Sequence, residues 1–163
     1  MKLHIVLSVA CSFAVALDRD VVAFDLEDQL GNRWESQKLV GAPYILIVAD
    51  REGAQHSEQW GTEIGRRVPK RTPIIGCANF DGVPFFLHWF VRMQVRKRQL
   101  PAPLLFDWDG ALFRRLGCKP GVPAILVVRS DGRIAFRYDG PPSTTAIDVV
   151  VGNVRSLLAD SER

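Results

Sequence analysis

Three cysteines, Cys11, Cys77 and Cys118, carry the most reactive side chains of this 163-residue sequence. A thiolate can attack a disulfide or bind a metal, but disulfide exchange also needs a second thiol to resolve the mixed disulfide. No two of these cysteines form a Cys-x-x-Cys pair, and no group of His and Cys residues has the spacing of a zinc site. We therefore expect no metal and no cofactor.

The two later cysteines lie in different settings. Cys77 lies inside the apolar stretch 74–79, which predicts a strand, and a cysteine in such a place is usually buried and inert. Cys118 lies in the loop 117–121 beside Lys119, whose charge is expected to lower the pKa of the thiol. An enzyme built on these thiols would use Cys118, with or without Cys77. The favoured interpretation, however, is that Cys118 is a small loop residue that takes no part in catalysis.

Two further groups of polar residues suggest chemistry. Asp50, Glu52, His56 and Ser57 offer a hydroxyl nucleophile and a base within one short loop. The sequence assigns no separate group to orient that base, so capping of the following helix by Ser57 is the favoured role. The segment 107–110, Asp-Trp-Asp-Gly, has two neighbouring carboxylates but lacks the other acidic ligands of a calcium loop, and we expect a turn and a helix N-cap there.

Alternating strands and helices are expected to position these groups. Short apolar runs predict strands at 21–26, 33–38, 44–49, 74–79, 104–106, 124–129 and 133–138. Apolar residues at helical spacing predict helices at 57–68, 85–98, 109–116 and from Ser143 onward. This order predicts one α/β domain over residues 21–160, with a mixed, mainly parallel central sheet, helices on both faces and an N-terminal β-hairpin.

Three stretches of the sequence follow a known family pattern. Residues 24–32 with 39–41 contain Phe-x-Leu-x-Asp-x-x-Gly, residues 44–50 form the central strand, and residues 121–134 contain Gly-x-Pro followed by a strand and Asp-Gly. Together they resemble the thioredoxin-like superfamily, in its redoxin, TlpA-like and peroxiredoxin-like branch. The resemblance implies a thioredoxin-like fold, a cis peptide bond between Val122 and Pro123 that faces the active site, and loops that hold extended peptide backbone.

The segment after the central strand departs from that family. Its members carry a nucleophilic cysteine there, at the start of the next helix, where the helix amides favour the thiolate. A Cys-x-x-Cys pair would fall at Glu52 and Gln55, whose side chains cannot exchange disulfides. We therefore favour a non-catalytic binding or accessory module for an unidentified protein or peptide. The alternative is a thiol-dependent oxidoreductase, thiol-disulfide or peroxidase-like, that uses Cys118 with or without Cys77. The expected binding residues are Asp50, Arg51, Glu52, Gln55, His56, Val122 and Pro123.

The N-terminal residues have the layout of a secretory signal. Lys2 is followed by the apolar run 3–15, and the small residues around Ala16 suit cleavage after that position. We therefore expect a signal peptide over residues 1–16 and a periplasmic or secreted protein. A lipoprotein anchored through Cys11 is less favoured, and a first strand or helix of the domain is a further alternative.

The helix expected from Phe85 to Arg98 has more apolar surface than one sheet face can cover. His88, Arg92 and Arg96 form a narrow polar stripe between two apolar arcs. One interpretation is a thick core with the C-terminal segment over the helix; the other is a surface for self-association, a partner or a membrane. The net charge of +3 is a weak excess, and we expect no nucleic acid.

Overall fold

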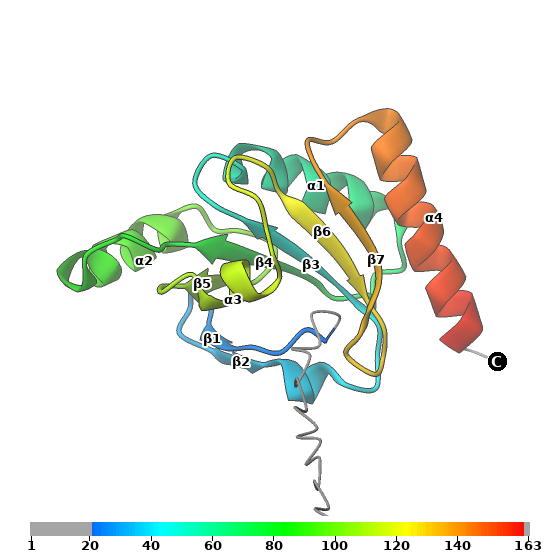
Figure 1. Ribbon diagram of the computed structural model, residues 1–163, viewed down its shortest axis with the longest axis horizontal. Coiled ribbons are helices and arrows are strands. Elements are labelled where there is room, and N and C mark those ends of the chain that lie inside the picture. Colours follow the sequence, from blue (N-terminus) through cyan, green and yellow to red (C-terminus); the bar gives the residue numbers. More distant parts are fainter. Residues whose placement is uncertain (1–20, 162–163) are drawn as a thin grey trace, which may run out of the picture.

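A five-stranded mixed sheet forms the centre of the computed structural model, which describes residues 21–161 (Figure 1). The strand order is β5-β4-β3-β6-β7. β4 and β5 run parallel to β3, β6 runs antiparallel to β3, and β7 runs antiparallel to β6. The central strand β3 is buried at all six positions, because both faces of the sheet are covered. The strands are β3 (Tyr44–Ala49), β4 (Ile74–Asn79), β5 (Leu104–Asp107), β6 (Ala124–Val128) and β7 (Ile134–Asp139).

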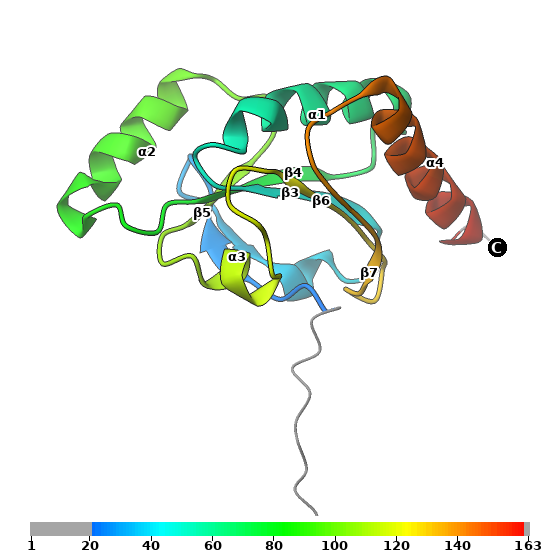
Figure 2. The ribbon, with the colours of Figure 1, turned by 45° about the horizontal axis from the view of Figure 1, so that its top comes forward.

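Two helices, α1 (Ala54–Arg67) and α4 (Thr144–Ser161), cover one face of the sheet (Figure 2). Trp60 and Ile64 of α1 are completely buried there, as the helical spacing predicted. The apolar stripe of α4 joins them, and its N-terminus is capped by Ser143, whose Oγ accepts a hydrogen bond from the backbone N–H of Ala146 at 3.2 Å. The other α4 residues of this cluster are Ile147, Val150, Val151 and Val154.

An N-terminal hairpin and a short helix cover the other face. They are β1 (Asp25–Glu27), β2 (Arg33–Glu35), the 3₁₀ turn η1 (Ser36–Leu39) and α3 (Ala111–Arg115). The side chain of Gln29 ties the hairpin to β5: its Oε1 accepts from the Leu104 N–H at 2.7 Å, and its Nε2 donates to the Ala102 carbonyl at 3.2 Å. The expected fold class, a mixed sheet with helices on both faces and an N-terminal hairpin, is confirmed.

The first expected strand is divided between two partners. Only residues from Asp25 onward pair with β2, in the register Leu26 to Trp34. Val22 instead donates its N–H to the carbonyl of Gly132 at 2.9 Å, in the turn between β6 and β7. The hairpin is shorter than expected, because the start of its first strand serves to attach it to the sheet.

The helix expected at 85–98 lies outside these layers. It is a 3₁₀ turn, η2 (Phe85–Leu87), followed by α2 (His88–Lys97), and neither contains a buried residue. In both views α2 projects beside β5, at the end of the sheet away from α4 (Figures 1 and 2). The interpretation in which the C-terminal segment covers this helix is wrong, because α4 packs on α1, β6 and β7 instead.

The described residues, 21–161, contain no helix that is long and apolar enough to cross a bilayer. The expected signal peptide at 1–16, its cleavage after Ala16 and the lipoprotein alternative at Cys11 lie outside the described residues.

Candidate functional site

One carboxylate joins the two loops that the sequence assigns to the binding surface. Asp50 directly follows β3, and its Oδ1 accepts the backbone N–H of Gly53 at 2.8 Å. Its Oδ2 accepts the backbone N–H of Gly121 at 2.9 Å, from the loop that precedes β6. Asp50 therefore caps the start of α1, where an anion also opposes the positive end of the helix dipole, and fixes the second loop against it.

The two loops touch backbone to backbone at Gly53. A Cβ atom at this position would lie 2.9 Å from the carbonyl carbon of Val122 and 3.1 Å from the nitrogen of Pro123. Real Cβ atoms do not approach other heavy atoms this closely, so the contact requires glycine. The side chain of Glu52 also reaches the second loop. A Cβ at Gly121 would lie 3.4 Å from its Oε2.

Pro123 is buried beneath this contact. Its carbonyl accepts the N–H of Gly140 at 3.0 Å, and the indole Nε1–H of Trp60 donates to the Gly140 carbonyl at 3.0 Å, which ties α1 to the same region. The expected cis bond before Pro123 is wrong, since no peptide bond among residues 21–161 is cis. The trans isomer is the ordinary state of an X–Pro bond, and Gly121, with φ of +81°, supplies the left-handed residue in this turn.

The remaining expected binding residues surround this junction. Arg51, Glu52 and Gln55 are exposed, whereas His56 and Val122 are half-buried. The structure thus brings the head of α1 and the loop before β6 together, as the sequence indicated. Their role in binding stays a prediction.

Ser57 neither caps α1 nor acts as an activated nucleophile. The helix begins at Ala54, three residues earlier than expected, so Ser57 lies within its first turn, after the Gly53 amide that Asp50 caps. The Ser57 hydroxyl oxygen is buried and has no hydrogen-bond partner among the described residues, which excludes His56 as its base in this arrangement.

Cys77 belongs to the core, as expected. It is 1% exposed on β4, and burial raises the pKa of its thiol well above the ordinary value. It packs on the sheet face that the hairpin and α3 cover, whereas α1 covers the opposite face. Its thiol therefore lies away from the head of α1.

Cys118 packs against the same cluster as Cys77 and is half-buried. Burial raises the pKa of its thiol to about 11, although the Arg137 guanidinium acts in the opposite direction. The expectation that Lys119 lowers this pKa is wrong, because the cation that influences the thiol is Arg137. That cation is itself paired with Asp139 at 2.8 Å. At neutral pH Cys118 is thus a protonated thiol.

Neither the protein-family models nor the curated proteins include a match to this chain. Solved structures do match. A secreted disulfide oxidoreductase of Mycobacterium tuberculosis, homologous to E. coli DsbE, is 21% identical, with a TM-score of 0.59 over 83% of this chain and 97% of that one. The exposed lipoprotein thioredoxin Etrx1 of Streptococcus pneumoniae is 14% identical, with a TM-score of 0.65 over 83% and 99%. The Xanthomonas campestris bacterioferritin comigratory protein, studied for alkyl peroxide reduction, is 16% identical, with a TM-score of 0.62 over 85% and 92%.

This chain has the thioredoxin-like fold. The resemblance inferred from the three sequence stretches is confirmed at the level of the fold. In this thioredoxin-like domain, the head of α1 presents Glu52 and Gln55 to solvent, and the residues between them include the glycine that contacts the second loop. A carboxylate and an amide in these places can bind by hydrogen bonds and charge, but they cannot exchange disulfides.

The acidic segment before α3 has the structural role that the sequence predicted. Asp107 is completely buried, and its Oδ2 accepts the N–H of Phe113 at 2.8 Å. Asp109 accepts the N–H of Ala111 at 3.1 Å, while Gly110 takes φ of +66° as the residue before the helix. Within the described residues, no three His, Cys, Asp or Glu side chains converge as metal ligands.

Sequence reasoning missed the double role of Asp50 and the close approach at Gly53. A signal for the first was present, because Asp50 precedes Gly53 by three residues, which is the spacing of a side-chain cap on a helix N-terminus. The contact between Gly53 and Val122 depends on how the two loops fold together, and no local pattern encodes it.

Proposed function

We propose that this thioredoxin-like domain is a non-catalytic binding or accessory module. The observation that carries the proposal is the composition of the α1 head, where Glu52 and Gln55 occupy the exposed positions next to the Asp50 cap. The two loops are nevertheless held together, by the Asp50 hydrogen bonds and by the backbone contact between Gly53 and the segment Val122–Pro123.

The state of the two described thiols supports a role without thiol chemistry. Disulfide exchange needs a thiolate that can reach its target and a second thiol to resolve the mixed disulfide. Cys77 is buried, and burial keeps both its thiol and that of Cys118 protonated near pH 7. The alternative, an oxidoreductase that uses Cys118 with or without Cys77, gains no support from this arrangement.

We propose that the ligand is an extended segment of another protein, held between the α1 head and the loop before β6. Arg51, Glu52 and Gln55 supply donors and acceptors, and half-buried Val122 supplies an apolar contact. We also propose that the protein acts outside the cytoplasm, because residues 1–16 have the composition of a signal peptide. The secreted M. tuberculosis protein is a structural neighbour with that location in its description.

Reduction of insulin by dithiothreitol, followed by turbidity, tests the absence of thiol catalysis. The wild-type chain is expected to leave the rate at background. The double variant Glu52→Cys with Gln55→Cys is expected to accelerate it, because a thiol at position 52 lies at the α1 N-terminus, where the helix dipole favours the thiolate. The control is Gln59→Cys with Thr62→Cys, which places the same spacing on exposed residues further along α1 and is expected to stay close to background.

Two results count against the proposal. Robust insulin reduction or peroxide consumption by the wild-type chain, abolished by Cys118→Ser, would make the protein a thiol enzyme. An inactive Glu52→Cys, Gln55→Cys variant that is folded by circular dichroism would show that the α1 head is not equivalent to the reactive position of an oxidoreductase.

A further inference from the structure

The segment η2–α2 exposes large aromatic side chains that a soluble protein normally buries. Phe85 is 85% exposed, Phe86 71%, Trp89 67% and Phe90 42%. The four lie within six consecutive residues and form one continuous patch, rather than the scattered single exposures that are common on protein surfaces. No other segment of residues 21–161 has a comparable set of exposed aromatic residues.

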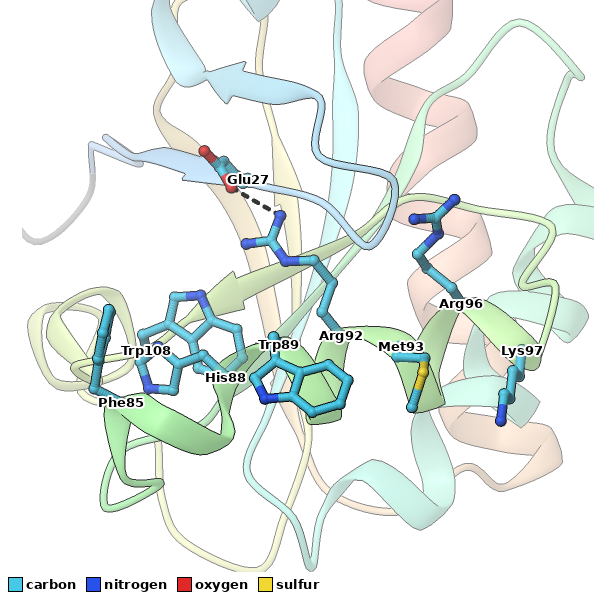
Figure 3. A pocket seen from close by; sticks show the side chains of 9 residues that line it. All are labelled: Glu27, Phe85, His88, Trp89, Arg92, Met93, Arg96, Lys97 and Trp108. Atoms are coloured by element: carbon cyan, nitrogen blue, oxygen red, sulfur yellow. Dashed lines mark ion pairs between the residues drawn. The ribbon is translucent and has the colours of Figure 1, made fainter.

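The helix directs two residues of its polar stripe, His88 and Arg92, toward the protein, and its aromatic arc toward solvent. The His88 ring stacks on Trp108, with ring centroids 3.8 Å apart and planes at 11°. Arg92 forms an ion pair with Glu27 at 2.8 Å (Figure 3). Its guanidinium also lies over the ring of Phe106, 5.4 Å from the ring centroid. Ordinary amphipathic helices have the opposite orientation. Polar and stacking contacts thus hold α2 in place, and its aromatic arc is left for another surface.

Basic residues continue the same exposed face. At about 100° per residue, Arg96 and Lys97 lie on the side of the helix that carries Trp89, two turns further along. Both are exposed, and so is Arg98. Residues 82–106 contain no Asp or Glu. Among residues 21–161, the acidic group that pairs with this helix is Glu27, which neutralises Arg92.

We propose that the segment η2–α2 docks the protein on the surface of an anionic lipid bilayer. Aromatic side chains favour the interfacial zone of a membrane, and neighbouring cations are attracted by anionic headgroups. Phe85 and Trp89 line an open groove of about 1000 Å³ rather than an enclosed pocket. Phe86 and Phe90 are exposed outside this groove, so the aromatic face is accessible to a broad surface such as a bilayer. A second copy of the chain is the weaker occupant, because a symmetric pairing would bring Arg96 and Lys97 against the same cations.

Docking in this manner would place the candidate binding site close to the membrane. β3 and β4 are parallel, so the loop that leads from β3 to the α1 head and the loop that leads from β4 to η2 leave the same edge of the sheet. This position of the site near the membrane does not depend on which ligand the site binds. The docking proposal likewise holds whether or not the site is catalytic.

Vesicle binding by the full chain tests the proposal. Vesicles of phosphatidylcholine with phosphatidylglycerol are expected to sediment the protein, those of phosphatidylcholine alone much less, and binding is expected to weaken as salt is raised. The charge variant Arg96→Glu with Lys97→Glu is expected to bind about tenfold more weakly. Its control, Lys70→Glu with Arg115→Glu, makes the same change of net charge at exposed residues elsewhere and is expected to bind nearly as the wild type.

Tryptophan fluorescence detects membrane contact of this helix without a signal from residues 1–20, which contain no tryptophan. Trp60 is buried and Trp34 and Trp108 are half-buried, so a blue shift and quenching by brominated lipid are expected to come mainly from Trp89 and to be lost in Trp89→Phe. The proposal is overturned if anionic vesicles cause no change at Trp89, or if both charge variants bind equally. It is also overturned if Phe86→Ala with Trp89→Ala abolishes a dimer seen by ultracentrifugation while vesicles have no effect, because the face would then belong to a second copy.

Discussion

Asp50 shows how one side chain can fix the geometry of two loops that are far apart in sequence. Its two oxygens accept amides from residues about seventy positions apart in sequence, Gly53 and Gly121. A hydrogen bond to a charged acceptor contributes about 1.5–3 kcal/mol, so these two bonds are enough to hold an exposed loop junction in one arrangement. The exposed neighbours Glu52 and Gln55 are therefore presented on a rigid base.

Cys118 shows that the nearest charge in sequence does not decide the reactivity of a thiol. Burial raises its pKa to about 11, so we expect slow alkylation by iodoacetamide at pH 8 in the folded protein and fast alkylation in urea. Asp139→Asn is expected to accelerate the folded-state reaction, because Asp139 raises this pKa and its removal frees Arg137 to favour the thiolate. Mass spectrometry of the peptide that contains Cys118 measures the rate.

The control for that experiment is Asp131→Asn, which breaks a similar ion pair, with Arg129, in the turn between β6 and β7. It is expected to leave the rate unchanged. Alkylation of the folded wild-type protein as fast as in urea would show that the thiol is open and ionised, and would revive Cys118 as a catalytic candidate.

At the scale of elements, the start of α1 depends on a contact rather than on helix propensity. Gly53 has φ of −66°, which any residue adopts, but a Cβ there would meet the backbone of Val122 at 2.9 Å. Gly53→Ala is therefore expected to lower the free energy of unfolding by about 1–3 kcal/mol, measured by urea denaturation. Gly152→Ala is the matched control: its Cβ meets nothing within 4 Å in α4, and higher helix propensity is expected to stabilise by about 0.5–1 kcal/mol. An unchanged or raised stability of Gly53→Ala would show that the loop contact is not tight.

The strands were easier to predict than the starts of the helices. Residues 44–49 and 74–79 form strands with the expected bounds, because continuous apolar runs leave few alternatives for a buried segment. The start of α1 was misplaced because Ser57 has the chemistry of a cap, whereas the side chain that caps the helix belongs to Asp50. Similarly, the two apolar arcs of 85–98 could not reveal which arc faces water, since this depends on where α4 packs.

Across the whole molecule, the two faces of the sheet differ in chemistry. The face under α1 and α4 is built from aliphatic and aromatic groups. The face under the hairpin and α3 also contains Tyr44, Cys77, Cys118 and Asp107, and burial raises the pKa of all four. The sequence indicated that these segments are buried, but not that their weak acids gather on one face, because that depends on the register of β3, β4 and β5.

This asymmetry predicts that alkali destabilises the folded state through ionisable groups on the hairpin face. Burial raises the pKa of Tyr44 from 10 to about 12, so between these values the unfolded chain has lost the phenolic proton while the folded chain keeps it. The folded state then binds more protons, and the free energy of unfolding must fall as pH rises from 10 to 12. Tyr44→Phe removes this component, and its unfolding free energy is expected to decline less steeply over that range.

The same variant is expected to be at least as stable as the wild type at pH 7, because the Tyr44 hydroxyl is buried without a hydrogen-bond partner among the described residues. Tyr138→Phe is the control, since Tyr138 lies on the other face, 5.4 Å from Trp60, and its removal leaves Tyr44 in place. Urea denaturation at pH 7, 10 and 11.5 measures the free energy of unfolding of both variants and so distinguishes the effect of Tyr44 from that of Tyr138. Equal alkaline slopes in wild type and Tyr44→Phe would place the sensitive group elsewhere, with the thiols of Cys77 and Cys118 as the next groups to replace, because their pKa values are raised on the same face.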